Sequence, residues 1–342
     1  MLDSAARASN QVLIGEDHFF NEIPRFVSAI ATSTTFQNFI VEIDPYTANL
    51  LQEKISKLSP ADFTNFNRQW QETFSFYALK PEMELLKEMV KSGVRIGGTD
   101  QIILMSDRLI ANSLKKKSKD KEAIKLYEQI ETQATRHFNA FLKDQTQPFY
   151  MLTAAFDSVL NKLLTLPLSA DEQKQLHDLQ LSKRIYSEGS HWLRLQLMKN
   201  NFYNYYYPRV TDQKTLYKFG CNHLTKGEGL LGGYDIGNIV YNIADSRYEK
   251  SLHIMIVGKN GWQGSPFKNF PAQQLDPVNG ELKVLKAFFD ETGDEWMCFD
   301  LTKMHRPLRR GDLKIDDLFL RRVLQGYDYL VVIPEVTAAS MD

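Results

Sequence analysis

The sequence predicts an α/β fold with a mostly parallel central sheet that is flanked by helices and carries a large helical insertion. Strand-like and helix-like runs alternate over residues 1–100, which is typical of parallel α/β sheets. Residues 101–209 show almost only helical periodicity, and strand-like runs return after them. We therefore expect an α/β core domain formed by residues 1–100 and 210–342, with residues 101–209 as a helical insertion that covers the cleft.

Three strands are expected in the first hundred residues, at residues 11–15, 39–44 and 94–98. Helices are expected between them, over residues 23–32, after Asp44, after Ser59 and over residues 81–93. Pro45 and Pro60 stand at early helical positions, where the missing N–H of proline would have no partner in any case. Ser59 is a candidate helix cap, and Gly93 ends the last of these helices.

The second half of the chain is expected to complete the sheet. Apolar residues spaced by three and four predict helices over residues 121–144, 149–164 and 185–207. Strand-like runs follow at residues 216–220, 252–258, 295–301 and 327–335. Further helices are expected near residues 236–247, 279–291 and 314–324.

Composition indicates a soluble chain with a large core, since 43% of its 342 residues are hydrophobic. The 41 basic and 42 acidic residues nearly cancel, which argues against nucleic acid as a partner. No run approaches the roughly 20 apolar residues of a membrane span, and no signal peptide is visible; the compartment, cytoplasmic or extracytoplasmic, stays open. Cys221 and Cys298 are expected to be buried free thiols, because two cysteines alone form no zinc framework.

Polar side chains follow four of the predicted parallel strands. Open parallel sheets bind ligands outside the carboxyl ends of their strands, so these groups are expected to meet at one edge. In chain order they are Glu16, Asp17 and His18, then Glu42 and Asp44, then Asp100, and then Asn222 and His223. Each of the two histidines follows a glycine by three residues, Gly15 and Gly220, and glycine would let the backbone turn tightly there.

Some of these groups have a second interpretation. Asp44 and Asp100 could equally cap helices. Glu42 alternates with apolar neighbours, and a buried carboxylate without a partner would be unfavourable, so we expect a partner for it. The remaining histidines are expected to be structural: His137, His177, His191, His253 and His305.

The last helix of the insertion contributes a further group of residues. Arg194, Met198 and Asn201 stand at i, i+4 and i+7, and therefore share one helix face. An arginine next to carboxylates can pair with them bidentately and keep them ionised. The alternative interpretation is an arginine on the surface. The tyrosines that follow, at positions 203, 205, 206 and 207, are open to either a pocket or a packing role.

These motifs together resemble the erythromycin-esterase-like superfamily, which is related to the ChaN haem-binding lipoproteins and the Tiki/TraB proteins. The G-E-x-H turn of that family is matched by Gly15, Glu16 and His18. The other matched positions are Glu42, Asp100, the R-x-x-x-M-x-x-N helix with Arg194, Met198 and Asn201, the histidine turn at His223, and the last strand in YDYLVVIPEVTAAS. Order and spacing agree over nearly the whole chain.

The later histidine turn departs from the esterase pattern. Esterase-type members carry H-N-x-H there, whereas this chain has GCNH, with Gly220 in the place of the first histidine. The Tiki/TraB-like form, with glycine three residues before the histidine, is closer. This departure speaks against macrolide esterase activity itself.

The resemblance and the residues together predict a hydrolase for a small-molecule ester or a related acyl compound. His18 would be the general base that activates water, oriented by Glu16 or Glu42. Arg194 and His223 would stabilise the developing oxyanion. The residues expected to contact substrate are Asp17, Asp100, Met198, Asn201 and Asn222. No G-x-S-x-G motif supports a covalent serine route.

Two alternatives use the same residues differently. In a metal-dependent hydrolase of the Tiki/TraB type, His18, His223, Glu16 and Glu42 would hold a divalent metal with an open position for water. In a ligand-binding protein of the ChaN type, a histidine or tyrosine would bind haem. We expect catalysis without a metal, because the fixed charge of Arg194 would repel a dication in the same site. The substrate and the oligomeric state stay open.

Overall fold

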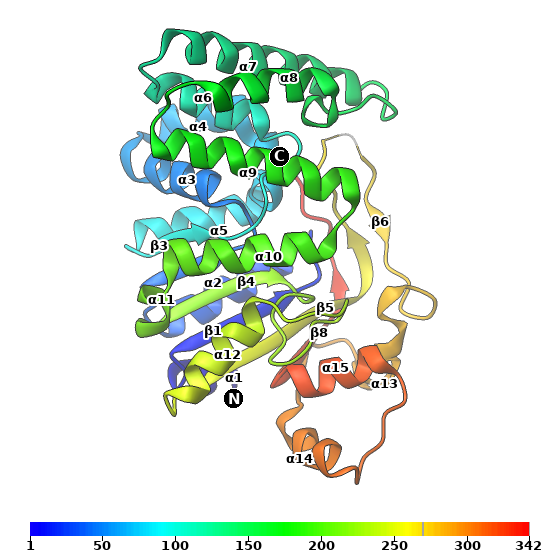
Figure 1. The fold of residues 1–342 in the computed structure, drawn as a ribbon. Coiled ribbons are helices and arrows are strands. Elements are labelled where there is room, and N and C mark those ends of the chain that lie inside the picture. The colour runs from blue at the N-terminus through cyan, green and yellow to red at the C-terminus, as the bar shows by residue number, and fades with distance from the viewer. Residues whose placement is uncertain (269, 342) are drawn as a thin grey trace.

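The computed structural model describes residues 1–268 and 270–341 and is built on one mostly parallel sheet (Figure 1). The strands lie in the order β3 (Arg95–Gly98), β2 (Asn38–Val41), β4 (Thr215–Gly220), β1 (Gln11–Glu16), β5 (Ser251–Gln263), β8 (Tyr329–Val336) and β7 (Met297–Asp300). Neighbouring strands pair in parallel except β7, which is antiparallel to β8. The short β6 (Gln273–Gln274) pairs with the end of β5. The predicted fold class is confirmed.

The strand order creates a crevice at the carboxyl end of β1. The chain passes from β1 to β2 on one side, skipping the position that β4 later fills. It then passes from β4 to β5 across β1 to the other side. Connections that leave neighbouring strands in opposite directions open a space above the sheet, where parallel α/β proteins bind their ligands.

Helices cover both faces of the sheet (Figure 1). The core on one face contains side chains of α1 (Leu2–Arg7), α2 (Glu22–Ser33), α3 (Pro45–Lys57) and α5 (Lys80–Lys91), and it extends to α4 (Pro60–Trp70). The other face packs against α10 (His191–Asn201), α11 (Arg209–Asp212), α12 (Ile236–Ser246), α13 (Lys286–Glu291), α14 (Thr302–Arg310) and α15 (Leu318–Gly326). The two cores have different members, so the sheet separates them completely.

A third apolar core lies among helices away from the sheet. Its helices are α6 (Asp107–Lys117), α7 (Lys121–Phe141), α8 (Ala154–Thr165) and α9 (Ala170–Glu188), of which α6, α7 and α8 lie at the top of Figure 1. No strand occurs between residues 101 and 209, all of which are described. The helix α10 and the π-helical turn after it, Phe202–Tyr206, pack on the sheet instead. The division of the chain at residues 101 and 209 stays a prediction.

Several expectations about single elements are corrected. The strand β2 ends at Val41, so Glu42 stands just beyond it rather than inside a strand. The helix α14 was not predicted, because its sequence is mostly polar and basic and contains Pro307. Cys298 is an exposed free thiol, since β7 is an edge strand, whereas Cys221 is buried as expected. Among the described residues, no helix has the length and apolar character that crossing a membrane requires.

Two predicted N-caps are present, at the starts of α3 and α4. The side chain of Asp44 accepts hydrogen bonds from the backbone N–H groups of Tyr46 and Thr47 at the start of α3. Burial raises the pKa of this carboxyl to about 6 despite those bonds. Ser59 caps α4 in the same way. Asp44 is therefore a helix cap, and it does not line the cavity.

Candidate active site

A cavity of about 630 Å³ opens at the carboxyl ends of β1, β2 and β4. The predicted site residues that line it are Glu16, Asp17, His18, Glu42, Arg194, Asn222 and His223. The long strand β5 and the short strand β6 supply an outer wall that includes Lys259, Gln263 and Gln274. Of residues 101–209, Arg194 alone lines the cavity. One space thus joins residues that lie more than two hundred positions apart in the sequence.

His18 is held by its neighbour two residues earlier. Its Nδ1 lies 2.7 Å from Oε1 of Glu16, and its Nε2 lies 3.6 Å from Oε2 of Glu42. Its ring stacks on Phe76 with a centroid separation of 4.1 Å, and 21% of the side chain stays exposed. Burial alone would lower the pKa of His18, but the carboxylates of Glu16 and Glu42 raise it above its usual value. With Nδ1–H bonded to Glu16, Nε2 is the nitrogen available toward the cavity.

The backbone after His18 is strained and fixed. Phe19 has a φ of 75°, in the left-handed region that non-glycine residues seldom adopt. Its carbonyl accepts hydrogen bonds from the N–H of Gly264 at 3.1 Å and of Ala339 at 2.9 Å. Such strain persists only where the surroundings impose it, and it concentrates at functional sites.

Glu42 is the central carboxylate of the site and is almost fully buried. It accepts hydrogen bonds from the backbone N–H of Gly220 and from Nη2 of Arg194, each at 2.6 Å. The Nε2 atom of His223 lies 3.4 Å from its Oε1. Burial would raise the pKa of Glu42, but His223, His18 and Arg194 together lower it well below its usual range. The expected partner of Glu42 is therefore present, and the surrounding cations favour the ionised form of the carboxylate.

Arg194 joins two acidic residues across the edge of the cavity. Its guanidinium donates to Asp100 through Nε at 2.9 Å and through Nη2 at 2.7 Å, in addition to Glu42. Burial alone would lower the pKa of Arg194, but Asp100 and Glu42 raise it well above its usual value. The alternative of a surface arginine is wrong, and Asp100 binds Arg194 rather than capping a helix.

Met198 and Asn201 do not reach the cavity. Met198 is completely buried in the core between α10 and the sheet. The side-chain N–H of Asn201 donates to the carbonyl of Thr99 at 2.9 Å. Both residues sit behind Arg194 and Asp100, where they can position the site but cannot touch a molecule bound in the cavity.

His223 lies between two carboxylates. Its Nδ1 makes a very short contact with Oδ2 of Asp235, and its Nε2 faces Glu42. Burial would lower the pKa of His223, but Glu42 and Asp235 raise it to about 10. Both ring nitrogens face carboxylates, and this favours the imidazolium form of His223. Asp17 completes the wall, with a hydrogen bond from Gln263 at 3.1 Å and a pKa that burial raises to about 6.

The two glycines before the histidines are needed for space and not for a turn. Neither Gly15 nor Gly220 has a positive φ, so the expected reason for glycine is wrong. A Cβ on Gly220 would lie 2.8 Å from Nε2 of His18, and a Cβ on Gly15 would lie 2.5 Å from the hydroxyl of Tyr327. A side chain at position 220 would therefore displace the His18 ring.

The other histidines lie outside the cavity. His137 contacts the carbonyl of Pro148, and His305 that of Tyr327. His253 is buried, with ring nitrogens bonded to Leu224 and Ser251, and burial lowers its pKa to about 3. His177 is exposed on α9. His191 is the nearest to the site, with its ring centroid 6.2 Å from that of His223.

Sequence interpretation missed three charged residues, of which Asp235 and Lys218 bind site residues and Glu82 binds Lys218. Asp235, just before α12, holds His223. Lys218 in β4 donates to Oε1 of Glu16 at 2.7 Å and to Oε1 of Glu82 at 2.8 Å. A signal existed for two of them, because Lys218 interrupts an apolar strand and Glu82 stands on the apolar face of a helix. Asp235 has no comparable signal, since an acidic residue before a helix is common.

The candidate donors do not fit a metal ion. Within residues 1–268 and 270–341, no three histidine, cysteine, aspartate or glutamate side chains are arranged to hold one. Glu16 is bound by Lys218 and His18, and Glu42 by Arg194. Both nitrogens of His223 already face carboxylates. The cations of the chain itself occupy the acidic groups that a metal would need.

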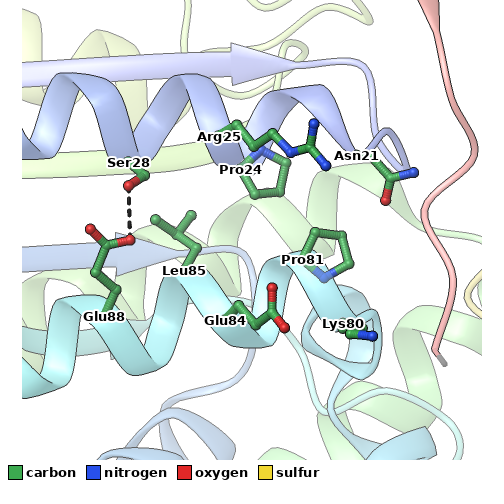
Figure 2. A pocket seen from close by; sticks show the side chains of 9 residues that line it. All are labelled: Asn21, Pro24, Arg25, Ser28, Lys80, Pro81, Glu84, Leu85 and Glu88. Carbon is green, nitrogen blue, oxygen red and sulfur yellow. Dashed lines mark hydrogen bonds between the residues drawn. The ribbon is translucent and has the colours of Figure 1, made fainter.

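A second hollow, of about 500 Å³, lies between α2 and α5 (Figure 2). Its walls are the outward faces of the two helices, with Arg25 and Ser28 on one side and Lys80, Glu84 and Glu88 on the other. Ser28 donates to Glu88 at 2.8 Å across it. It contains no histidine and no buried charged group.

Fold and site together define an α/β protein with a histidine–carboxylate pocket at the switch point of its sheet. No family model and no curated protein sequence matches the chain. Solved structures do match. A mutant of erythromycin esterase EreC in its open conformation aligns with a TM-score of 0.58 and 14% identity, covering 100% of this chain and 93% of that one.

Two further structures align equally well. A succinoglycan biosynthesis protein has a TM-score of 0.56 at 13% identity, covering 100% of this chain and 91% of that one. A protein from Bacillus cereus has a TM-score of 0.55 at 14% identity, covering 100% and 92%. At such identities the likeness concerns the fold: this chain has the erythromycin-esterase-like fold, which the sequence motifs predicted.

Proposed function

We propose that the protein is a hydrolase in which His18 activates a water molecule for attack on an ester or a related acyl compound. The observation that supports this most is the orientation of His18. Glu16 binds Nδ1, which leaves Nε2 facing a cavity that also holds the imidazolium of His223 and the guanidinium of Arg194. A base and two cationic groups in one pocket suit acyl transfer to water.

In this mechanism a water molecule bound near Nε2 of His18 attacks the acyl carbon while Nε2 takes one of its protons. The imidazolium that forms is stabilised by Glu16 and Glu42. His223 and Arg194 stabilise the oxyanion of the tetrahedral intermediate. When the intermediate collapses, the proton passes from His18 to the leaving oxygen, so an acid and an alcohol are released and the base is regenerated.

The pH dependence of hydrolysis should be bell-shaped. His18 must be neutral to act as a base, and its pKa lies above the usual 6.5. Activity should therefore rise with pH, with the midpoint of the rise above pH 6.5. His223 must be protonated, and its pKa is about 10, so activity should fall above that pH. The measurement is kcat/KM against pH with a chromogenic ester. A flat profile from pH 6 to 9 would argue against His18 as the base.

Hydrolysis should not depend on a metal ion. The acidic groups of the pocket are already neutralised by Arg194, Lys218 and His223. Exhaustive treatment with a chelator should therefore leave ester turnover unchanged, as measured before and after dialysis. If activity disappears and returns with zinc or manganese, the water is activated by a metal, and His18 is a ligand instead of a base.

A further inference from the structure

A chain of four charged side chains runs from the cavity into the core. It begins at His18, whose Nδ1 contacts Oε1 of Glu16 at 2.7 Å. The ammonium of Lys218 donates to that same oxygen at 2.7 Å. Lys218 also donates to Oε1 of Glu82 at 2.8 Å. The order is therefore imidazole, carboxylate, ammonium, carboxylate, and the last two members do not touch the cavity.

The inner members of this chain are buried in an apolar surrounding. The side chains of Glu16, Lys218 and Glu82 are 2%, 3% and 3% exposed. In the sheet, Lys218 pairs with Ile14 on one side and Val41 on the other, both completely buried. A lysine in such a row is unfavourable unless it is paired, and α5 supplies the pairing carboxylate. Replacing a buried ion pair with apolar residues of similar volume is often neutral or stabilising, so a buried ion pair is weak evidence of a purely stabilising role.

The second oxygens of both carboxylates accept no hydrogen bond from the described residues. The charges on Glu16 and Glu82 are thus offset mainly through their Oε1 atoms. Glu16 is shared between two cationic partners, His18 and Lys218, that contact the same oxygen. Lys218 is in turn shared between two carboxylates. A change of charge on Glu82 must therefore change the interaction between Glu16 and His18 at the other end of this series.

We propose that Lys218 and Glu82 are positioning residues that hold Glu16 in place and set how strongly it binds the imidazolium of His18. The proposal deepens the proposed function, and it rests on that function only where turnover is concerned. In this arrangement Glu82 draws part of the ammonium charge away from Glu16. Glu16 then keeps more of its negative charge for His18, which makes His18 a better proton acceptor.

Few other charged groups lie near this series of four charged side chains. His18 faces Glu16 and Asp17 from β1 and the turn after it, Glu42 from the end of β2, and Lys218 from β4. The group that faces Glu82 besides these is the phenol of Tyr77, whose pKa burial raises well above the usual value. Burial raises the pKa of Glu82 to about 7, while Lys218 opposes the rise. The ionised form of Glu82 is the one that acts on Lys218, so the effect of Glu82 on His18 grows as Glu82 loses its proton.

The test is a titration of the His18 imidazole by NMR in the full-length protein without substrate. Glu82→Gln keeps the shape and the hydrogen bond to Lys218 but removes the charge. It should lower the pKa of His18 by on the order of 0.5–1 unit, since loss of a nearby anion destabilises the imidazolium. Lys218→Met removes a cation and should shift the same pKa upward. Shifts of opposite sign cannot come from a general loosening of the fold.

Glu84→Gln is the matched control. It removes the same charge from the same helix, but Glu84 points into the outer hollow in Figure 2, where solvent screens it. It should leave the His18 titration unchanged. An unchanged pKa in Glu82→Gln, or an equal shift in Glu84→Gln, would overturn the proposal, and this holds even if Lys218→Met does not fold. If the shifts occur but no ester is hydrolysed, the inference stands and the proposed function fails.

Discussion

Replacing His18 with alanine should lower turnover of a responsive ester by roughly 10²–10⁴-fold, the usual effect of losing a general base. The geometry explains the size of the effect. Glu16 binds Nδ1, so Nε2, which lies 3.6 Å from Oε2 of Glu42, is the ring nitrogen on the side of the cavity. The measurement is kcat with saturating substrate, accompanied by a thermal unfolding curve to show that the variant is folded.

His137→Ala is the control for this experiment. His137 lies on α7 far from the cavity lining and contacts the carbonyl of Pro148. It should change turnover little. Similar losses in both variants would mean that the experiment measures stability and not chemistry, and the assignment of His18 as the base would then have no support.

Replacing Arg194 with alanine should destabilise the fold by about 3 kcal/mol, because two buried carboxylates lose their shared cation. The side chains of Glu42 and Asp100 are 4% and 6% exposed. Arg194→Lys should rescue little of the loss, since an ammonium cannot make the paired contacts of the guanidinium. Urea unfolding measures the effect as a lower midpoint at unchanged slope.

The pH dependence of this loss has a definite sign. Arg194 helps to lower the pKa of Glu42 below its usual value, so its contribution to stability is present above pH 4.5 and is lost as Glu42 takes up a proton in the folded state. The difference between wild type and Arg194→Ala should therefore narrow as the pH falls below 4.5. Arg184→Ala, which removes an arginine paired with Glu188 on the surface of α9, should leave the midpoint unchanged. A difference that grows in acid would contradict the ion-pair explanation.

The site residues that could be predicted from the sequence are those that follow the end of a strand. His18 and His223 come directly after β1 and β4, and these strands are parallel neighbours, so their carboxyl ends meet. Glu42 and Asp100 follow β2 and β3 in the same way. Met198 shows where such inference fails. Helical spacing placed it on the face of Arg194, but a side chain one turn farther along α10 points into the core.

The sequence by itself determined the fold class, the strands and the set of groups delivered to one edge of the sheet, because these depend on local periodicity and on the geometry common to all parallel sheets. The tertiary structure decided the partners: Lys218 beneath Glu16, Asp235 behind His223, and the space that Gly220 leaves for His18. Alternation along β4 tells which residues share a face, but not which helix covers that face. Glu82 meets Lys218 only because α5 packs there, and no local pattern specifies that contact.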